Sequence, residues 1–204
     1  MLSLLILALM LVSSASLIPS LPHRAFLSTL TTAAFTTSLF PLSASASPLV
    51  SGEESIMSSK AHGTTATAVP DELLWNTDAK LADKICSFNR HWAEPARTWT
   101  SQSDFIAQVK ALKPGEAITF FDSVSNEPLF KAPVGRSGDE FLAESKSHGW
   151  PSFRDSEVVW ETVRVLKDGE TVSVGGTHLG HNLPDRTGNR YCVNLCCVAG
   201  KGKK

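Results

Sequence analysis

Charge is distributed unevenly along this chain, and this limits which part of it can fold. No Asp or Glu precedes Glu53, and Arg24 is the only Lys or Arg before that position. The surface of a soluble domain is normally rich in charged side chains. We therefore expect residues 1–46 to lie outside the folded domain.

The first 46 residues contain two segments that resemble targeting signals. Leu2–Val12 is an apolar run with the length of a signal-peptide core, and it is too short to span a bilayer. A second unit begins at Arg24, continues through an apolar stretch rich in Ser and Thr, and ends at the small residues Ala44–Ala46. Two such units in tandem resemble the bipartite leaders of plastid proteins.

This pattern predicts a cleaved targeting region over 1–46 and entry into the secretory pathway. The destination would be the outside of the cell or a plastid or thylakoid lumen, with no stable membrane anchor after processing. The alternative is that residues 20–60 form a disordered linker rich in Ser and Thr.

The remaining composition favours one ordinary domain over 70–204. The chain has 42% hydrophobic residues, five tryptophans and a formal net charge of -1. Its only basic cluster is the terminal Lys201–Lys204, so no nucleic-acid partner is expected. Residues 47–69 are rich in Ser, Thr, Ala and Gly without apolar periodicity, and they are predicted to be a flexible linker.

Three segments carry signals for helices. Asp78 can cap a helix that runs to about Cys86, and Ser103 can cap a second one that Pro114 terminates. Ser137 and Glu140 have the spacing of a capping box, which predicts a third helix to about Lys146.

Strand signals dominate the C-terminal half. Two strands over 158–166 and 171–174 flank an Asp-Gly pair, which predicts a hairpin with a two-residue turn. Ala117–Phe121 and Leu129–Phe130 are expected to be shorter strands. Tyr191–Val198 is expected to be one strand with Cys192, Asn194 and Cys196 on one face. The prediction is a mainly β α+β domain.

Three short blocks contain the candidate chemistry. They are Gly149–Trp150–Pro151–Ser152–Phe153, His178–Leu179–Gly180–His181 and Arg190–Tyr191–Cys192–Val193–Asn194. In this order they resemble the signature blocks of the B-type methionine-R-sulfoxide reductases, with a core over 118–198. The resemblance implies a small antiparallel domain of two sheets, tent-like, with a few peripheral helices. It also implies thiol-dependent reduction of methionine-R-sulfoxide in oxidised proteins or peptides.

The resemblance also implies roles for individual residues. Cys192 matches the nucleophile, which becomes a sulfenic acid, and Arg190 is a cation that can favour its thiolate. His178 and His181 match the positions beside the sulfoxide oxygen, where one of them acts as general acid. Asn194 is expected to form a hydrogen bond in the site.

The substrate side of the site is assigned in the same way. Trp150 matches an aromatic wall for the S-methyl group, and Phe153 is grouped with it as substrate-binding. Asp185 is expected to orient a histidine. The nearby Gly175–Gly176 and Pro184 indicate that the two histidines lie in a loop.

The sequence departs from the family in its cysteines. The two C-x-x-C pairs that hold zinc in many members are replaced by Asp122 and Ser125 and by Val172 and Gly175. No zinc or other cofactor is therefore expected, and hydrophobic packing is expected to replace that cross-link.

The family's resolving thiol next to the tryptophan is also missing. Cys86, Cys196 and Cys197 are the remaining candidates for that role, and Cys86 is favoured because it lies on a separate element. Direct reduction by a small thiol or a thioredoxin-like partner is equally compatible with the sequence.

Two other functions remain open. A module that binds methionine-containing or oxidised peptides without turnover would keep the aromatic wall but not the chemistry. A Cys–His hydrolase would use Cys192 and His178 and would need a backbone oxyanion hole.

Overall fold

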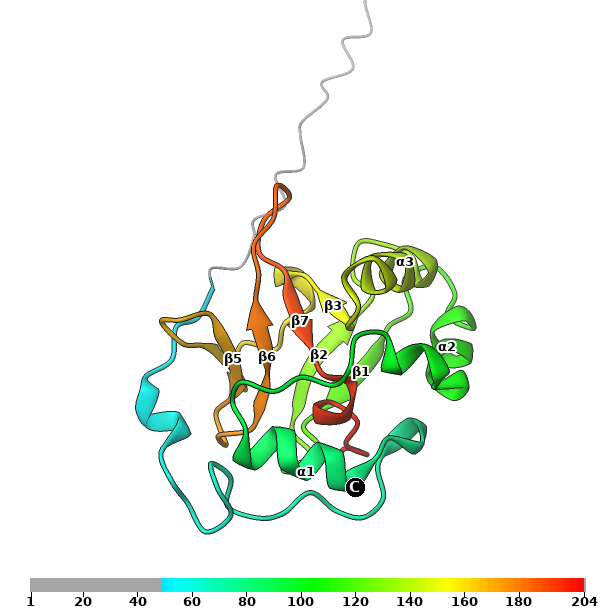
Figure 1. The fold of residues 1–204 in the computed structure, drawn as a ribbon. Helices are drawn as coiled ribbons and strands as arrows, with labels where there is room; N and C mark the ends of the chain where they lie inside the picture. The colour runs from blue at the N-terminus through cyan, green and yellow to red at the C-terminus, as the bar shows by residue number, and fades with distance from the viewer. Residues whose placement is uncertain (1–48, 204) are drawn as a thin grey trace, which may run out of the picture. The chain divides into compact units, whose positions relative to one another are not determined.

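A computed structural model describes residues 49–203, so the predicted targeting region over 1–46 lies outside the described residues. Within this range the chain forms three α-helices and two antiparallel sheets, which confirms the mainly β α+β class (Figure 1). No helix in these residues is both long and apolar enough to cross a membrane.

The smaller sheet pairs β1 (Ile118–Phe121) with β2 (Pro128–Ala132). The larger sheet has the order β3-β7-β6-β5-β4. Its strands in that order are Ser152–Phe153, Tyr191–Val193, His178–Asn182, Glu170–Ser173 and Val163–Val165. An isolated antiparallel bridge pairs Phe130 of β2 with Val158, in the segment between β3 and β4.

The helices begin close to where their capping residues predict. In α1 (Ala79–Phe88), the Asp78 carboxylate accepts from the amides of Lys80 and Leu81. In α3 (Gly138–His148), both hydrogen bonds of the predicted capping box are present. The prediction for α2 (Ser103–Lys110) is wrong in detail, because Gln102 is its N-cap and its side chain makes no capping bond.

The predicted hairpin is present as β4 and β5, but its turn differs. Leu166 and Glu170 are still paired by a backbone hydrogen bond of 2.8 Å, which leaves three residues in the turn instead of two. Gly169 in this turn has a φ of +92°, a conformation that glycine adopts without steric cost. The first strand is also shorter than expected: β4 spans Val163–Val165, because residues 160–162 form a turn in which the Thr162 amide donates to the Val159 carbonyl at 3.1 Å.

Two predictions near the site are wrong. The segment with both histidines is strand β6 and not a loop, because it hydrogen-bonds to β5 on one side and β7 on the other. The strand predicted over 191–198 ends at Val193, and Leu195–Cys197 form a short 3-10 helix, η5. The chain turns there, so Cys192, Asn194 and Cys196 do not share one strand face.

The expectation of a flexible linker is also wrong for residues 49–69. Ser51 bridges Val165 at the free edge of β4, and Glu54–Met57 form a short 3-10 helix, η1. Met57 and Thr65 are buried. This segment therefore belongs to the domain, since it covers a sheet edge whose backbone groups would otherwise lack partners.

An aromatic cluster fills the space between the sheets and the helices. The ring of Phe153 stacks on that of Phe130 with a centroid distance of 4.2 Å and also contacts the rings of Phe120 and Phe141. All four side chains are fully buried. The cluster holds β3 against the smaller sheet and so fixes one border of the candidate site.

Candidate active site

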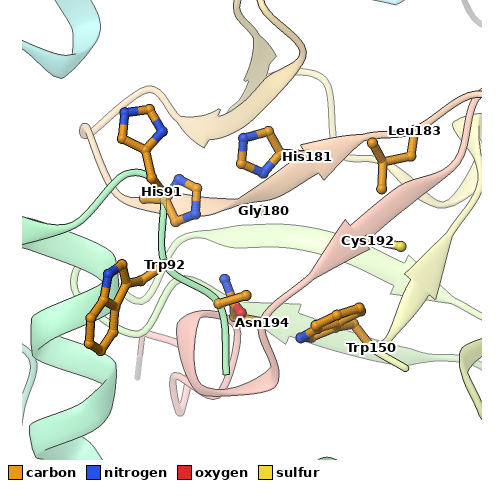
Figure 2. A pocket seen from close by; sticks show the side chains of 10 residues that line it. His91, Trp92, Trp150, Gly180, His181, Leu183, Cys192 and Asn194 are labelled. Carbon is orange, nitrogen blue, oxygen red and sulfur yellow. The ribbon is translucent and has the colours of Figure 1, made fainter. Parts of the chain in front are cut away.

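The three sequence blocks meet at one cavity of about 250 Å³. Figure 2 shows the side chains of His181, Trp150 and Cys192 around this space, with Trp92 and Asn194 on another side. The residues that line it are His91, Trp92, Ala93, Trp150, His178, Gly180, His181, Leu183, Cys192 and Asn194. Five of the predicted site residues therefore lie together: Trp150, His178, His181, Cys192 and Asn194.

Strand register places four polar side chains in one row across the larger sheet. Glu170 pairs with His181, His181 pairs with Cys192, and Cys192 pairs with Ser152. Directly paired residues on adjacent antiparallel strands project from the same face. The row therefore sets the Cys192 thiol between an imidazole and a hydroxyl.

A β-bulge explains why both histidines reach the cavity. Residues three apart in a regular strand point to opposite faces. Here Thr171 pairs with Gly180 and Val172 pairs with His178, so Leu179 is an extra residue in β6. Bulges re-aim side chains in this way. Leu179 is fully buried in the core, while His178 and His181 both line the cavity.

Gly180 allows the strands around the thiol to approach closely. A Cβ atom at this position would lie 2.0 Å from the backbone oxygen of Cys192 and 2.9 Å from the Cα of Val193. Only a residue without a side chain fits between the two histidines and β7 at this distance.

Cys192 is half-buried and has a cation on its sulfur. Burial raises the pKa of the thiol, and the Arg190 guanidinium opposes this rise by donating from Nη1 to Sγ at 2.5 Å. The buried Ser152 hydroxyl also favours the thiolate and has no other hydrogen-bond partner among the described residues. Burial outweighs both, so Arg190 contacts Cys192 as expected but does not bring the pKa below its usual value.

The ring of His178 is fixed by a carboxylate that the sequence prediction missed. Its Nδ1 is 2.7 Å from Oε1 of Glu170, and both residues are buried. Arg90 donates to the other oxygen of Glu170, from Nε at 2.8 Å and from Nη2 at 2.5 Å. Burial opposes ionisation of Glu170, but these hydrogen bonds outweigh it and lower its pKa. The carboxylate is therefore charged, and its hydrogen bond fixes the orientation of the His178 ring.

His181 lacks a carboxylate of this kind. Burial lowers its pKa, and the neighbouring His178 lowers it further. The centroids of the two imidazole rings are 5.5 Å apart. The cavity therefore contains two histidines in different electrostatic environments.

Trp150 is held at the cavity by backbone hydrogen bonds around it. Its Nε1 donates to the carbonyl of Glu94 at 2.9 Å. The preceding Gly149 ends α3 with a φ of +96°, and its carbonyl accepts from Arg97 N and Trp99 Nε1. These bonds fix the indole face as one wall of the cavity.

Asn194 lines the cavity but its amide is used for structure. Its Oδ1 accepts from the Glu94 amide at 2.9 Å, and its Nδ2 donates to the carbonyl of Leu179 at 3.1 Å. The side chain therefore connects the loop after α1 to β6, and its hydrogen bonds at the site are to backbone groups.

Part of the wall comes from a segment outside the three sequence blocks. His91, Trp92 and Ala93 follow α1, and Trp92 is 50% exposed, with the Lys84 ammonium 3.8 Å from its ring centroid. The signal available in the sequence for this loop was a tryptophan next to a histidine and shortly before Pro95.

Two predicted substrate residues are not in the cavity. Phe153 points into the aromatic cluster and is 0% exposed, because residues 152 and 153 face opposite sides of β3. Asp185 lies in the turn after β6, where its carboxylate accepts from Thr187 and forms an ion pair with Arg154. These contacts hold its pKa far below the usual range, and it contacts neither histidine.

The three cysteines considered as resolving thiols are fully buried and do not line the cavity. The Sγ atoms of Cys86 and Cys197 are 2.8 Å apart, and that of Cys196 is 4.0 Å from Cys197. None of them is placed to attack a sulfenic acid on Cys192 in this conformation.

The positions that replace the zinc ligands carry few donor atoms. Val172 and Gly175 have no side-chain donor atom, and the buried Asp122 carboxylate accepts from the Thr177 hydroxyl at 2.9 Å. This hydrogen bond joins the β1–β2 turn to the β5–β6 turn. The expectation that apolar packing alone replaces the cross-link is therefore incomplete.

One other group of potential ligands occurs within residues 49–203, namely Glu144, His148 and Asp185. Both carboxylates are already paired with arginines: Glu144 with Arg136 and Arg154, and Asp185 with Arg154. Their charge is thus neutralised without an ion.

Comparison of the chain with family models, with curated proteins and with solved structures found no match in any of the three.

Proposed function

We propose that this protein reduces methionine-R-sulfoxide in oxidised proteins or peptides, with Cys192 as the nucleophile. The observation that supports this best is the composition of one cavity. A thiol with a guanidinium on its sulfur, two imidazoles and an indole all line or adjoin it. Sulfoxide reduction needs a nucleophile for sulfur, a proton donor for oxygen and an apolar wall for the methyl group.

In the proposed reaction the Cys192 thiolate attacks the sulfoxide sulfur, and the oxygen is then transferred to the cysteine sulfur. The sulfur–oxygen bond of the substrate breaks as that oxygen is protonated, and the oxygen ends on Cys192 as a sulfenic acid. The substrate sulfur gains two electrons and becomes a thioether, and the cysteine sulfur loses two. Trp150 would hold the S-methyl group against its ring face during this step.

Different roles are proposed for the two histidines. His178 is assigned as the proton donor, because the Glu170 carboxylate holds its Nδ1 and leaves Nε2 as the ring nitrogen for the sulfoxide oxygen in the cavity. His181, whose pKa is lowered by burial and by His178, would remain neutral and donate a hydrogen bond to the oxygen.

Regeneration of Cys192 is assigned to an external thiol. One thiol would convert the sulfenic acid into a mixed disulfide and water, and a second would release Cys192 as a thiol. A small thiol or a thioredoxin-like partner is favoured because Cys86, Cys196 and Cys197 are buried away from the cavity.

The test is consumption of the separated R and S epimers of a blocked methionine sulfoxide by the full chain with dithiothreitol. We expect loss of the R epimer alone, and no loss of either with Cys192→Ser. Cys196→Ser is the matched control, because it removes a thiol of the same chain that lies outside the cavity. Equal loss of both epimers, or R-specific loss that persists in Cys192→Ser, contradicts the proposal.

One observation favours the binding module as a second candidate. Because burial raises the pKa of Cys192, most of this thiol is protonated at neutral pH. A module without turnover would bind the R epimer measurably, for example by calorimetry, and leave its concentration unchanged in the presence of dithiothreitol.

A further inference from the structure

Two cysteines that the proposed reaction does not use lie against each other in the core. Cys86 is in α1 and Cys197 is in η5, and they are 111 positions apart in the sequence. Their Sγ atoms are 2.8 Å apart and both side chains are fully buried. We propose that Cys86 and Cys197 form a disulfide bond that fastens α1 to the C-terminal segment.

The geometry selects this pair among the four cysteines. The sulfurs of a disulfide are about 2.05 Å apart, so Cys86 and Cys197 need to approach by about 0.8 Å. The Sγ of Cys196 is 4.0 Å from that of Cys197, and a bond between adjacent residues would be strained. Cys192 lines the cavity and contacts Arg190 instead.

The bond requires an oxidant, which we take to be a low-molecular-weight disulfide such as oxidised glutathione. One protein thiolate attacks it, forming a mixed disulfide and releasing one glutathione thiol. The second protein thiolate then displaces the other glutathione. Two protein thiols and one glutathione disulfide thus become one protein disulfide and two glutathione thiols. Both cysteines are inaccessible in the folded protein, so the bond forms during folding.

The bond would hold together two segments that continue into the wall of the cavity. α1 leads directly into the loop with His91, Trp92 and Ala93, while η5 directly follows Asn194. The Asn194 side chain already accepts a hydrogen bond from the same loop, at the Glu94 amide. The disulfide would add a covalent tie between these two segments and leave Cys192 as the thiol available for chemistry.

The test begins with the full chain, reduced in denaturant and refolded in a glutathione redox buffer. Free thiols are then alkylated in denaturant and the peptides are mapped by mass spectrometry without reduction. We expect alkylated Cys192 and Cys196 and a linked peptide pair containing Cys86 and Cys197. Alkylation of all four cysteines, or a link through Cys192 or Cys196, overturns the proposal.

Neighbouring substitutions provide the control. Cys196→Ala keeps the link, whereas Cys197→Ala loses it and leaves Cys86 alkylated. Closing so long a loop is expected to raise the melting temperature by about 10 °C relative to the reduced chain. Dithiothreitol should therefore lower the melting temperature of the wild type and of Cys196→Ala; no change in either counts against the bond.

The mapping also separates this proposal from the proposed function, since it needs no activity. Cys192→Ser, which would be inactive as a reductase, is expected to keep the Cys86–Cys197 link. A link without any sulfoxide reduction in the wild type would leave the disulfide established and remove the reductase proposal alone.

Discussion

Two neighbouring rows of residues, each running across the strands of the larger sheet, are held in place by different kinds of interaction. One of them, called the polar row, contains one residue from each of four adjacent strands: Ser152, Cys192, His181 and Glu170. The next row, called the aromatic row, contains Phe153 and Tyr191, which pair with each other, and the ring of Phe153 faces the aromatic cluster. The two rows are one residue apart along the chain, so the same backbone positions a reactive site on one face and a core on the other.

The polar row depends on specific partners. Glu170 is buried and ionised because Arg90 and His178 both hydrogen-bond to it, and Cys192 is contacted by Arg190. In the aromatic row, Phe153 depends on contact area and shape, because its ring contacts three other rings. Changes in the aromatic row should therefore alter stability, and changes in the polar row should alter reactivity.

The largest effect is expected for Phe153→Ala. Removing a fully buried ring that contacts three others should lower the free energy of unfolding by about 3–5 kcal/mol, measured by urea denaturation. The matched control is Phe88→Ala, since Phe88 is 57% exposed, and its change should stay within about 0.5 kcal/mol. Equal losses in the two variants would mean that the aromatic row is not the core of this sheet.

The next effect is expected for Glu170→Gln in the polar row. The amide replaces the charged carboxylate that pairs with Arg90 and holds the His178 ring, so the proton donor loses its position and kcat for the R epimer should fall about 100-fold with little change in KM. Glu170→Asp should recover part of kcat. The control is Asp83→Asn. Asp83 pairs with His62 at a distance of 2.9 Å, and neither residue lines the cavity. A rise in KM at unchanged kcat would assign Glu170 to substrate binding instead.

Most of the fold could be predicted from local signals. Asp78, the Ser137 and Glu140 pair and the Asp-Gly turn each act within a few residues, and all three mark real element ends. The course of residues 49–69 could not be predicted, because a Ser- and Thr-rich composition says nothing about a sheet edge that is free to be covered.

The candidate site was predictable where short blocks carry it. Cys192, His178, His181 and Trp150 do line one cavity. Glu170 and the loop at His91 were missed because strand register and a long-range approach bring them there. The same reasoning misplaced Phe153, because a residue next to a site residue on a strand faces the other way.

A smaller effect is expected for Arg190→Gln, on the thiol itself. Because burial raises the pKa of Cys192, its alkylation by iodoacetamide in the wild type should still accelerate with pH above about 8.5. Loss of the positive charge should raise the pKa further and slow alkylation at pH 8 about tenfold. Arg186→Gln, an exposed arginine of the same loop, is the control and should leave the rate unchanged. Faster alkylation in Arg190→Gln would mean that the main effect of this arginine is to block access to the thiol and not to stabilise the thiolate.

The smallest effect is expected for Ser152→Ala, at the edge of the polar row. The hydroxyl faces Cys192 in register and favours its thiolate, so removing it should slow alkylation about threefold. Stability should not fall, because the hydroxyl is buried without another partner among the described residues. Ser147→Ala, at an exposed position of α3, should change neither quantity. A loss of stability with an unchanged alkylation rate would mean that Ser152 contributes to the core and not to the site. The polar row would then end at Cys192 in β7.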